Sequence, residues 1–162
     1  FIACGIAYNH ESPRRGEDFV TRKITKAIAA IMAGTQETLT LGTLSAMRDW
    51  SHARDIVQGA WLSLQARIPE DYIFASGRPR SVEEFARVAF SVVGLKASDY
   101  LMSDPALFRP TEVSRLCGSS VKAWRQLGWT PQVTFQHLVE EMVHHDQALI
   151  HTLRPHSEPV TP

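Results

Sequence analysis

The stretch "YNHESPRRGEDFVTRKI", residues 8–24, concentrates an amide, an imidazole, three acids and four cations around one proline and one glycine. The residues before it, "FIACGIAY" (1–8), are short, apolar and followed by turn formers, which predicts a buried strand. From Phe19, near its end, apolar residues recur at helical spacing over 19–33. A strand that leads through a charged loop into a helix indicates an α/β fold.

Strand and helix patterns alternate along the rest of the chain. Short apolar segments predict strands at 38–42 and 71–77, and residues 81–94 and 121–128 have the spacing of short helices. The last helix is expected to run to about residue 153, followed by a flexible, proline-rich tail at 154–162. The expected N-caps are Asp18 or Glu17, Ser51, Ser81 and Thr134, and the apolar stripe after Ser51 is Ile56, Val57, Ala60, Trp61 and Leu64.

The number of strands bears on the completeness of the fold. Strands are few for the number of helices, whereas a complete doubly wound sheet needs more of them. No Gly-rich turn follows a strand, so the dinucleotide-binding fingerprint is missing. We therefore expect residues 1–153 to form the C-terminal part of a Rossmann-type α/β fold, with the Gly-rich cofactor half absent.

Composition limits the partners. Lys and Arg together number 17, as do Asp and Glu, so the whole molecule has no net attraction for nucleic acid or anionic membrane. No apolar stretch has the length of a membrane span. Two cysteines, Cys4 and Cys117, are too few for a disulfide framework, which favours a reducing cytoplasm. We expect neither nucleic acid nor membrane as a partner.

Four motifs carry a family resemblance. "YNHESPRRGEDFVTRKI", "LGTLSAMRDWSHARDIVQGAWLSLQ", "PEDYIFASG" and "RPTEV" occur in this order, with spacing that resembles the GDP-mannose 4,6-dehydratases. These are extended short-chain dehydrogenase/reductase enzymes of the NAD-dependent epimerase/dehydratase family. "NHESPRRG" followed by "FVTRKI" is the specific part, while "RDW" and "RPTEV" are shared more widely among nucleotide-sugar enzymes. The resemblance implies the C-terminal half of an epimerase/dehydratase fold, including the substrate-binding region.

The resemblance also implies an activity. The family's lyases convert GDP-mannose to GDP-4-keto-6-deoxymannose by internal hydride transfer through NADP. No tyrosine of this chain is followed four positions later by lysine, so we expect no catalytic residue here and an inactive isolated chain. The chain would supply nucleotide-sugar binding. The alternatives are an epimerase or reductase of the same superfamily, and a truncated, non-catalytic nucleotide-sugar-binding domain.

Arg48 and Arg109 are the leading substrate-binding candidates. Guanidinium groups form paired hydrogen bonds with phosphates, and both arginines stand at predicted junctions between loops and regular elements. From the residues alone, Arg48 is equally well explained by a surface ion pair with Asp49 or Asp55. The resemblance implies that Arg48 and Arg109 clamp the pyrophosphate of GDP-mannose.

Three further residues are assigned to the substrate by resemblance. Asn9 would contact the sugar diphosphate, although an Asn after a strand also commonly forms an Asx-turn. Lys23 would reach the nucleotide, or else be a solvated helical lysine. Glu112 would accept from a ribose or a guanine edge, or else be a loop carboxylate beside Arg109 or Arg115.

His10 and Arg15 match positions that the family uses for NADP. A 2'-phosphate attracts arginine for the same bidentate reason as a pyrophosphate. The loop with Arg14 and Arg15, between Pro13 and Gly16, is by resemblance a subunit contact, which implies a homo-oligomer. Taken alone, the two arginines read as solvated.

Histidines repeat on the last expected helix. His137, His144 and His151 recur every seven residues and therefore share a face. Steps of seven residues lie about 10 Å apart along a helix, so one ion cannot be held by all three. We predict a polar helix face and no metal site.

Overall fold

Eight short strands pair two by two over the residues that the computed structural model describes, 1–153. The predicted tail at 154–162 lies outside the described residues. β1 (Gly5–Ala7) runs parallel to β6 (Tyr72–Phe74), β2 (Asn9–Glu11) to β5 (Trp50–His52), and β3 (Leu39–Leu41) to β8 (Leu101–Ser103). The fourth pair is antiparallel, with β4 (Met47–Arg48) against β7 (Arg80–Ser81).

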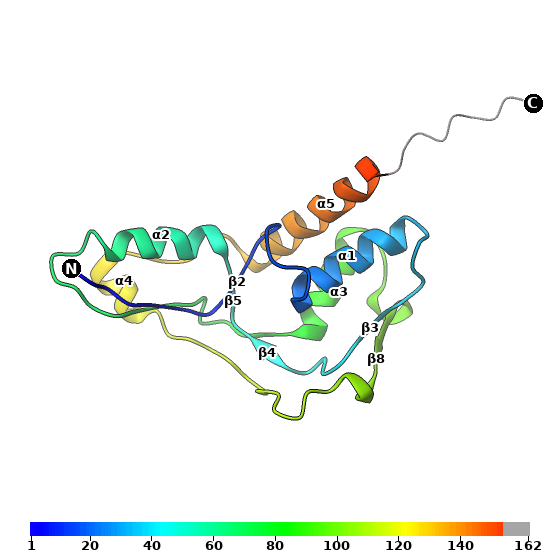
Figure 1. Ribbon diagram of the computed structural model, residues 1–162, viewed down its shortest axis with the longest axis horizontal. Helices are drawn as coiled ribbons and strands as arrows, with labels where there is room; N and C mark the ends of the chain where they lie inside the picture. The colour runs from blue at the N-terminus through cyan, green and yellow to red at the C-terminus, as the bar shows by residue number, and fades with distance from the viewer. Residues whose placement is uncertain (154–162) are drawn as a thin grey trace, which may run out of the picture.

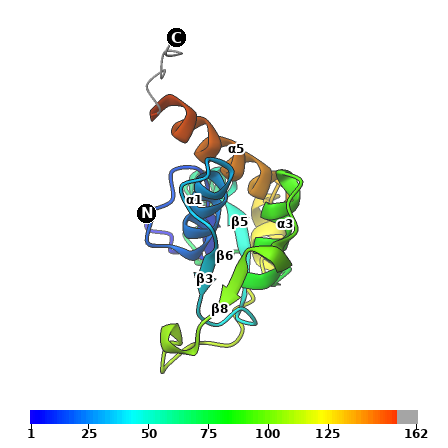
Figure 2. The same ribbon diagram turned by 90° about the vertical axis from the view of Figure 1, so that its right-hand side faces the viewer.

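The helices form two groups along the length of the molecule (Figures 1 and 2). α1 (Val20–Met32), α3 (Val82–Val92) and α5 (Phe135–Leu153) pack against one another. α2 (Ala53–Ser63) and α4 (Val121–Leu127) lie together near the N-terminus, beside β1 and β6. Two 3₁₀ turns, η1 (Ala97–Asp99) and η2 (Pro105–Leu107), flank β8.

Each helix group encloses its own hydrophobic core. The larger core joins α1, α3 and α5 through side chains such as Ile28, Phe85 and Val139, all fully buried. The smaller core contains Phe74 and Trp129, whose indole Nε1 donates to the Asp55 carbonyl oxygen over 2.8 Å. Burying one side chain of this size contributes about 1.5–3 kcal/mol, so the two cores hold the strand ends in place.

The predicted helix boundaries at α3, α4 and α5 are confirmed. The Ser81 hydroxyl accepts from the Glu84 N–H over 3.0 Å, as the capping pattern predicts. Thr134 caps α5 by accepting from the His137 N–H over 3.2 Å. Gly128 ends α4 with a φ of +67°, a left-handed conformation that costs glycine little.

The first predicted strand was wrong in both extent and burial. Regular pairing covers only β1, and the ladder breaks at Tyr8 before β2 begins at Asn9. All three residues of β1 are exposed, and Cys4 just before it is exposed as well. The physical reason is that β1 pairs on one side only, with β6, among the described residues.

Two of the predicted N-caps were wrong. Phe19 occupies the N-cap of α1 without a side-chain bond, while Glu17 instead forms an ion pair with Lys26 over 2.6 Å. Ser51 belongs to β5, so α2 begins one residue later than its predicted cap allowed. The actual cap is His52, whose Nδ1 accepts from the Arg54 N–H over 2.9 Å.

The predicted apolar stripe of α2 was also wrong. Val57, Trp61 and Leu64 are 59–68% exposed. The buried face instead carries Asp55, Ile56, Gly59 and Ser63. A Cβ at Gly59 would lie 2.6 Å from a Phe74 ring carbon, so this helix approaches β6 too closely for a larger side chain.

Candidate functional site

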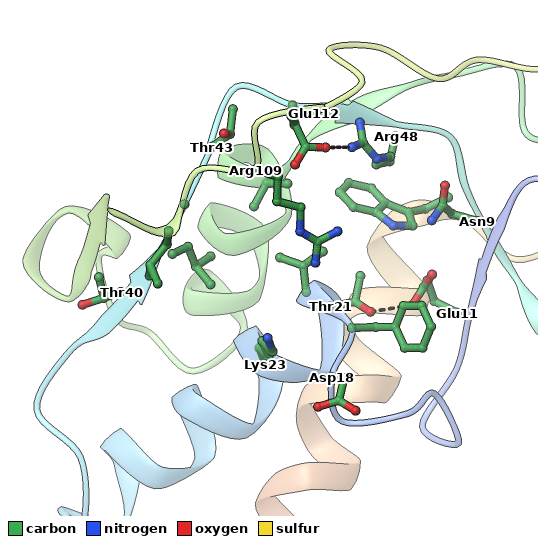
Figure 3. A pocket seen from close by; sticks show the side chains of 18 residues that line it. Asn9, Glu11, Asp18, Thr21, Lys23, Thr40, Thr43, Arg48, Arg109 and Glu112 are labelled. Atoms are coloured by element: carbon green, nitrogen blue, oxygen red, sulfur yellow. Dashed lines mark hydrogen bonds and ion pairs between the residues drawn. The ribbon is translucent and has the colours of Figure 1, made fainter. Parts of the chain in front are cut away.

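One cleft gathers all five predicted substrate residues (Figure 3). It has a volume of about 530 Å³ and lies where β2, β3, β4 and β5 meet the start of α1 and the loop after β8. This volume suits a nucleotide-sized ligand. Its polar and charged side chains are Asn9, Glu11, Asp18, Thr21, Lys23, Thr40, Thr43, Arg48, Arg109 and Glu112. Arg48 and Arg109, 61 positions apart in the chain, therefore share one cavity.

We call this cavity the first cleft. Because side chains alternate along β2, only some of them face it. Asn9 and Glu11 line the cleft, whereas His10 between them does not. Successive side chains of a strand point to opposite faces, which explains the division. The His10 Nδ1 instead lies 2.8 Å from the Tyr8 carbonyl oxygen.

Glu11 is a buried carboxylate in the wall of the first cleft. Its side chain is only 1% exposed. Burial raises the pKa of Glu11, and the Thr21 hydroxyl, which donates to its Oε2, and the nearby Arg15 only partly oppose this effect. A carboxyl with these surroundings holds a proton more readily than an exposed one.

Arg48 and Glu112 form an ion pair within the first cleft. The Arg48 Nη1 also donates to the Met47 and Val113 carbonyl oxygens, over 2.8 and 2.7 Å. Neither Asp49 nor Asp55 pairs with Arg48, so the surface ion pair weighed for this arginine is wrong. Its three bonds use three of the five N–H groups that a guanidinium carries.

The loop that carries Arg109 and Glu112 is fastened at both ends. On one side the Asp104 N–H donates to the Leu41 carbonyl over 2.9 Å, and a Cβ at Gly42 would lie 2.6 Å from the Leu107 carbonyl oxygen. On the other side Met47 exchanges backbone bonds of 2.8 and 3.0 Å with residues 114 and 116. The loop is therefore held against β4 at the mouth of the cleft.

Two cations of the first cleft remain available. Neither Arg109 nor Lys23 forms an ion pair within residues 1–153. Arg109 is exposed, and its guanidinium projects into the cavity from the opposite side to Lys23 (Figure 3). The cleft thus offers unpaired positive charge to an anionic ligand.

The predicted cofactor residues lie outside this cavity. The Arg15 guanidinium stacks 3.5 Å from the centre of the Phe19 ring, and its Nε lies 3.4 Å from Glu11 Oε2 without forming a hydrogen bond. Arg14 has an exposed side chain. Arg15 therefore belongs to the adjoining loop, and His10 lies on β2 outside the first cleft.

Sequence reasoning missed the residue that holds this loop. Arg22 is 5% exposed and makes two bonds to Asp146, of 3.2 and 2.7 Å. Its Nη1 also donates to the Pro13 and Arg15 carbonyl oxygens. Arg22 therefore ties the loop with Arg14 and Arg15 to α5, a contact between residues 124 positions apart.

Asp49 is the second missed residue. It is fully buried and accepts hydrogen bonds from Ser76, Gly77 and Gly118. It therefore joins three segments directly beside Arg48. An acid next to an arginine in sequence suggested an ion pair, and only the tertiary structure reveals the backbone donors.

The family of dehydratases described as GDP-mannose 4,6 dehydratase matches residues 1–142. The chain belongs to this family. GDP-mannose 4,6 dehydratase 2 of Arabidopsis thaliana is 50% identical over 149 residues, which cover 92% of this chain and 40% of the relative. GDP-mannose 4,6 dehydratase of Homo sapiens is 42% identical over 169 residues, covering 94% of the chain and 45% of the relative. The chain thus spans less than half the length of these dehydratases.

Solved structures share the fold. RMD from Pseudomonas aeruginosa, complexed with NADPH, superposes with a TM-score of 0.79 at 19% identity, over 89% of this chain and 47% of that one. A dTDP-glucose 4,6-dehydratase from Bacillus anthracis gives 0.74 at 18% identity, over 89% and 44%. The dehydratase-family chain is therefore part of a Rossmann-type epimerase/dehydratase fold. No helix within residues 1–153 is long and apolar enough to cross a membrane.

Proposed function

We propose that this chain forms the nucleotide-sugar-binding region of a GDP-mannose 4,6-dehydratase, a lyase that converts GDP-mannose to GDP-4-keto-6-deoxymannose. Family membership supports the reaction. The observation that carries the role of this chain is the first cleft, where Asn9, Lys23, Arg48 and Arg109 converge. Loop and strand-end positions of this kind are where α/β folds bind their ligands.

The diphosphate is the part of the substrate that these cations recognise. Arg109 and Lys23 meet it with charges that no carboxylate of the described chain neutralises. Arg48 contributes through the donors that its bonds to Met47, Val113 and Glu112 leave free. Asn9 offers a donor and an acceptor to a hydroxyl of the sugar or ribose. Glu112 both orients Arg48 and accepts from a ligand hydroxyl.

The positive charge of the loop with Arg14 and Arg15 suits a nicotinamide cofactor, which carries phosphates. Arg14 and Arg15 project between Pro13 and Gly16, with His10 nearby on β2, and the buried Arg15 Nε has no hydrogen-bond partner among the described residues. NADP, with its extra phosphate, is the form that two adjacent arginines favour. When bound, the cofactor supplies reversible hydride transfer. The NADPH described for the Pseudomonas aeruginosa relative supports this choice.

The remaining parts of the proposal concern the oligomeric state, the source of the catalytic groups and the cellular compartment. The same exposed loop is the proposed contact between subunits of a homo-oligomer. No tyrosine of the chain precedes a lysine by four positions, so the proton-transfer groups come from outside these residues. The free thiols Cys4 and Cys117 suit a cytoplasmic protein.

Calorimetric titration of the chain with GDP-mannose tests the binding role. Arg109→Ala removes a charge-assisted contact worth about 1.5–3 kcal/mol, so affinity is expected to fall roughly 10- to 100-fold. Arg67→Ala, an exposed arginine outside the cleft, is the matched control and is expected to bind like the parent. An Arg109→Ala chain that binds within about twofold of the parent would show that the diphosphate lies elsewhere.

A further inference from the structure

A second and larger cleft lies on the other side of Trp50. Its volume is about 840 Å³, and Trp50 is the one residue that lines both clefts. It is formed by β5, the segment from β6 to β7, α3, α4 and the residues before α5. Neither the predicted substrate residues nor the predicted cofactor residues line it.

The charge of the second cleft is predominantly positive. Three arginines line it, Arg78, Arg80 and Arg87, against one carboxylate, Glu84. Arg80 is neutralised by Glu84 at 2.5 Å and lies 5.2 Å from the centre of the Phe135 ring. Arg78 and Arg87 are exposed and form no ion pair within residues 1–153. An anion entering the second cleft therefore meets two uncompensated guanidinium groups.

A buried hydroxyl in the wall of the second cleft has no partner. Ser51 is 3% exposed, and its Oγ forms no hydrogen bond with any described residue. Buried polar side-chain atoms nearly always have a partner, and leaving one without costs about 1–3 kcal/mol. A ligand oxygen or nitrogen within the cleft would satisfy this hydroxyl.

The wall of the second cleft is also rigid. The turn that leads to Arg78 is fixed by Asp49, which accepts from the Ser76 and Gly77 N–H groups over 2.7 and 3.0 Å. The Ser76 hydroxyl further accepts from the Arg78 N–H over 3.1 Å. A wall that is already fixed in this way lowers the entropic cost of holding a ligand.

An aromatic surface completes the second cleft. The Trp124 indole on α4 lines it and is 56% exposed, unlike the buried Trp50. An exposed indole beside cations suits stacking of a planar ring whose substituent is anionic.

From these observations we propose that the second cleft is a separate binding site for a phosphate-bearing small molecule with a planar ring, of the nucleoside monophosphate class. Arg78 and Arg87 hold the phosphate, Trp124 stacks on the ring, and the Ser51 hydroxyl bonds to a polar atom of the ligand. This site does not depend on the function proposed for the first cleft.

Titration of the isotopically labelled chain with AMP, followed by amide NMR shifts, tests the proposal. Saturable shifts are expected at Ser51, Arg78 and Arg87. Arg78→Ala and Arg87→Ala, both exposed and thus compatible with folding, are each expected to weaken AMP binding by about tenfold. Arg125→Ala, an exposed arginine of α4 outside the second cleft, controls for the loss of one positive charge and is expected to bind like the parent.

Two further titrations distinguish binding in the second cleft from binding in the first, and a ring-bearing ligand from a simple phosphate. Arg109→Ala is expected to leave AMP binding at Ser51 unchanged, even though it weakens GDP-mannose binding in the first cleft. Inorganic pyrophosphate is expected to bind more weakly than AMP because it lacks a ring. The proposal is overturned by unsaturable shifts, by equal weakening in Arg78→Ala and Arg125→Ala, by loss of AMP binding only in Arg109→Ala, or by pyrophosphate binding as tightly as AMP.

Discussion

Replacing Asp49 with asparagine is expected to destabilise the chain far more than the small chemical change suggests. Asp49 Oδ1 accepts from the Ser76 N–H and hydroxyl, over 2.7 and 2.5 Å, and Oδ2 accepts from the Gly77 and Gly118 N–H groups, over 3.0 and 3.1 Å. In Asp49→Asn one of these oxygens becomes an NH₂ group that faces donors. Two of the four bonds are lost, and two donors that are at least partly buried are left without an acceptor.

The expected cost follows from those two donors. A fully buried donor without a partner costs about 1–3 kcal/mol, and most of these donors are partly buried, so Asp49→Asn is expected to lower the free energy of unfolding by about 2–4 kcal/mol. That is a large share of the roughly 5–15 kcal/mol that stabilises an ordinary domain. Ser76→Ala removes one donor to Asp49 and the acceptor of the Arg78 N–H, which is solvent-exposed, so it is expected to cost only about 1 kcal/mol.

Urea unfolding followed by circular dichroism measures both variants. Asp99→Asn, at an exposed aspartate of η1, serves as the control and is expected to change stability by less than about 0.5 kcal/mol. Should Asp49→Asn prove too unstable to purify, Ser76→Ala still reports on the network. Stability of Asp49→Asn within about 0.5 kcal/mol of the parent would refute the reasoning, because no donor would then have been left unpaired.

Three other changes test separate contacts. Burial raises the pKa of Glu11, so the parent is stabilised at low pH and loses this stability as pH rises above the ordinary carboxyl pKa. Glu11→Gln does not titrate, so it is expected to gain stability relative to the parent over the same pH rise. Urea unfolding at several pH values measures the difference. Gly59→Ala is expected to lower stability by about 1–3 kcal/mol in thermal unfolding, since the new Cβ would lie 2.6 Å from the Phe74 ring. Arg22→Met is expected to cost about 3–5 kcal/mol in urea, because Asp146 is left buried without its cation.

Each of these three variants has a matched control. Glu37→Gln makes the same chemical change at an exposed position, and an equal gain in Glu37→Gln and Glu11→Gln would contradict the role of burial. Gln58→Ala adds no bulk at an exposed position of the same helix, and equal losses in Gln58→Ala and Gly59→Ala would contradict the packing argument. Lys26→Met breaks an exposed ion pair of α1, and a loss as large as that of Arg22→Met would contradict the role of burial.

The sequence correctly predicted those features of the fold that depend only on residues close together in the chain. The capping spacing at Ser81 and the glycine stop at Gly128 depend only on residues within one helical turn, and both are confirmed. The family motifs predicted that Arg48 and Arg109 share a cavity, and they do. Their roles as ligands of a diphosphate stay a prediction.

The features that the sequence did not predict depend on contacts between residues far apart in the chain. Nothing near Arg48 in the sequence identifies Glu112 as its partner, 64 positions away. The face of α2 could not be assigned from apolar spacing, because its buried side includes Asp55, whose carboxylate accepts from the Gln132 and Val133 N–H groups. A buried acid that satisfies backbone donors looks, in sequence, like a surface residue.

The division of the four tryptophans gives the chain two sets of intrinsic fluorophores. Trp50 and Trp129 are 4% and 1% exposed, whereas Trp61 and Trp124 are 60% and 56% exposed. Iodide in solution should therefore quench one pair and spare the other, and unfolding should shift the emission of the spared pair to longer wavelength. The unlabelled polypeptide thus carries separate optical signals for its interior and its surface.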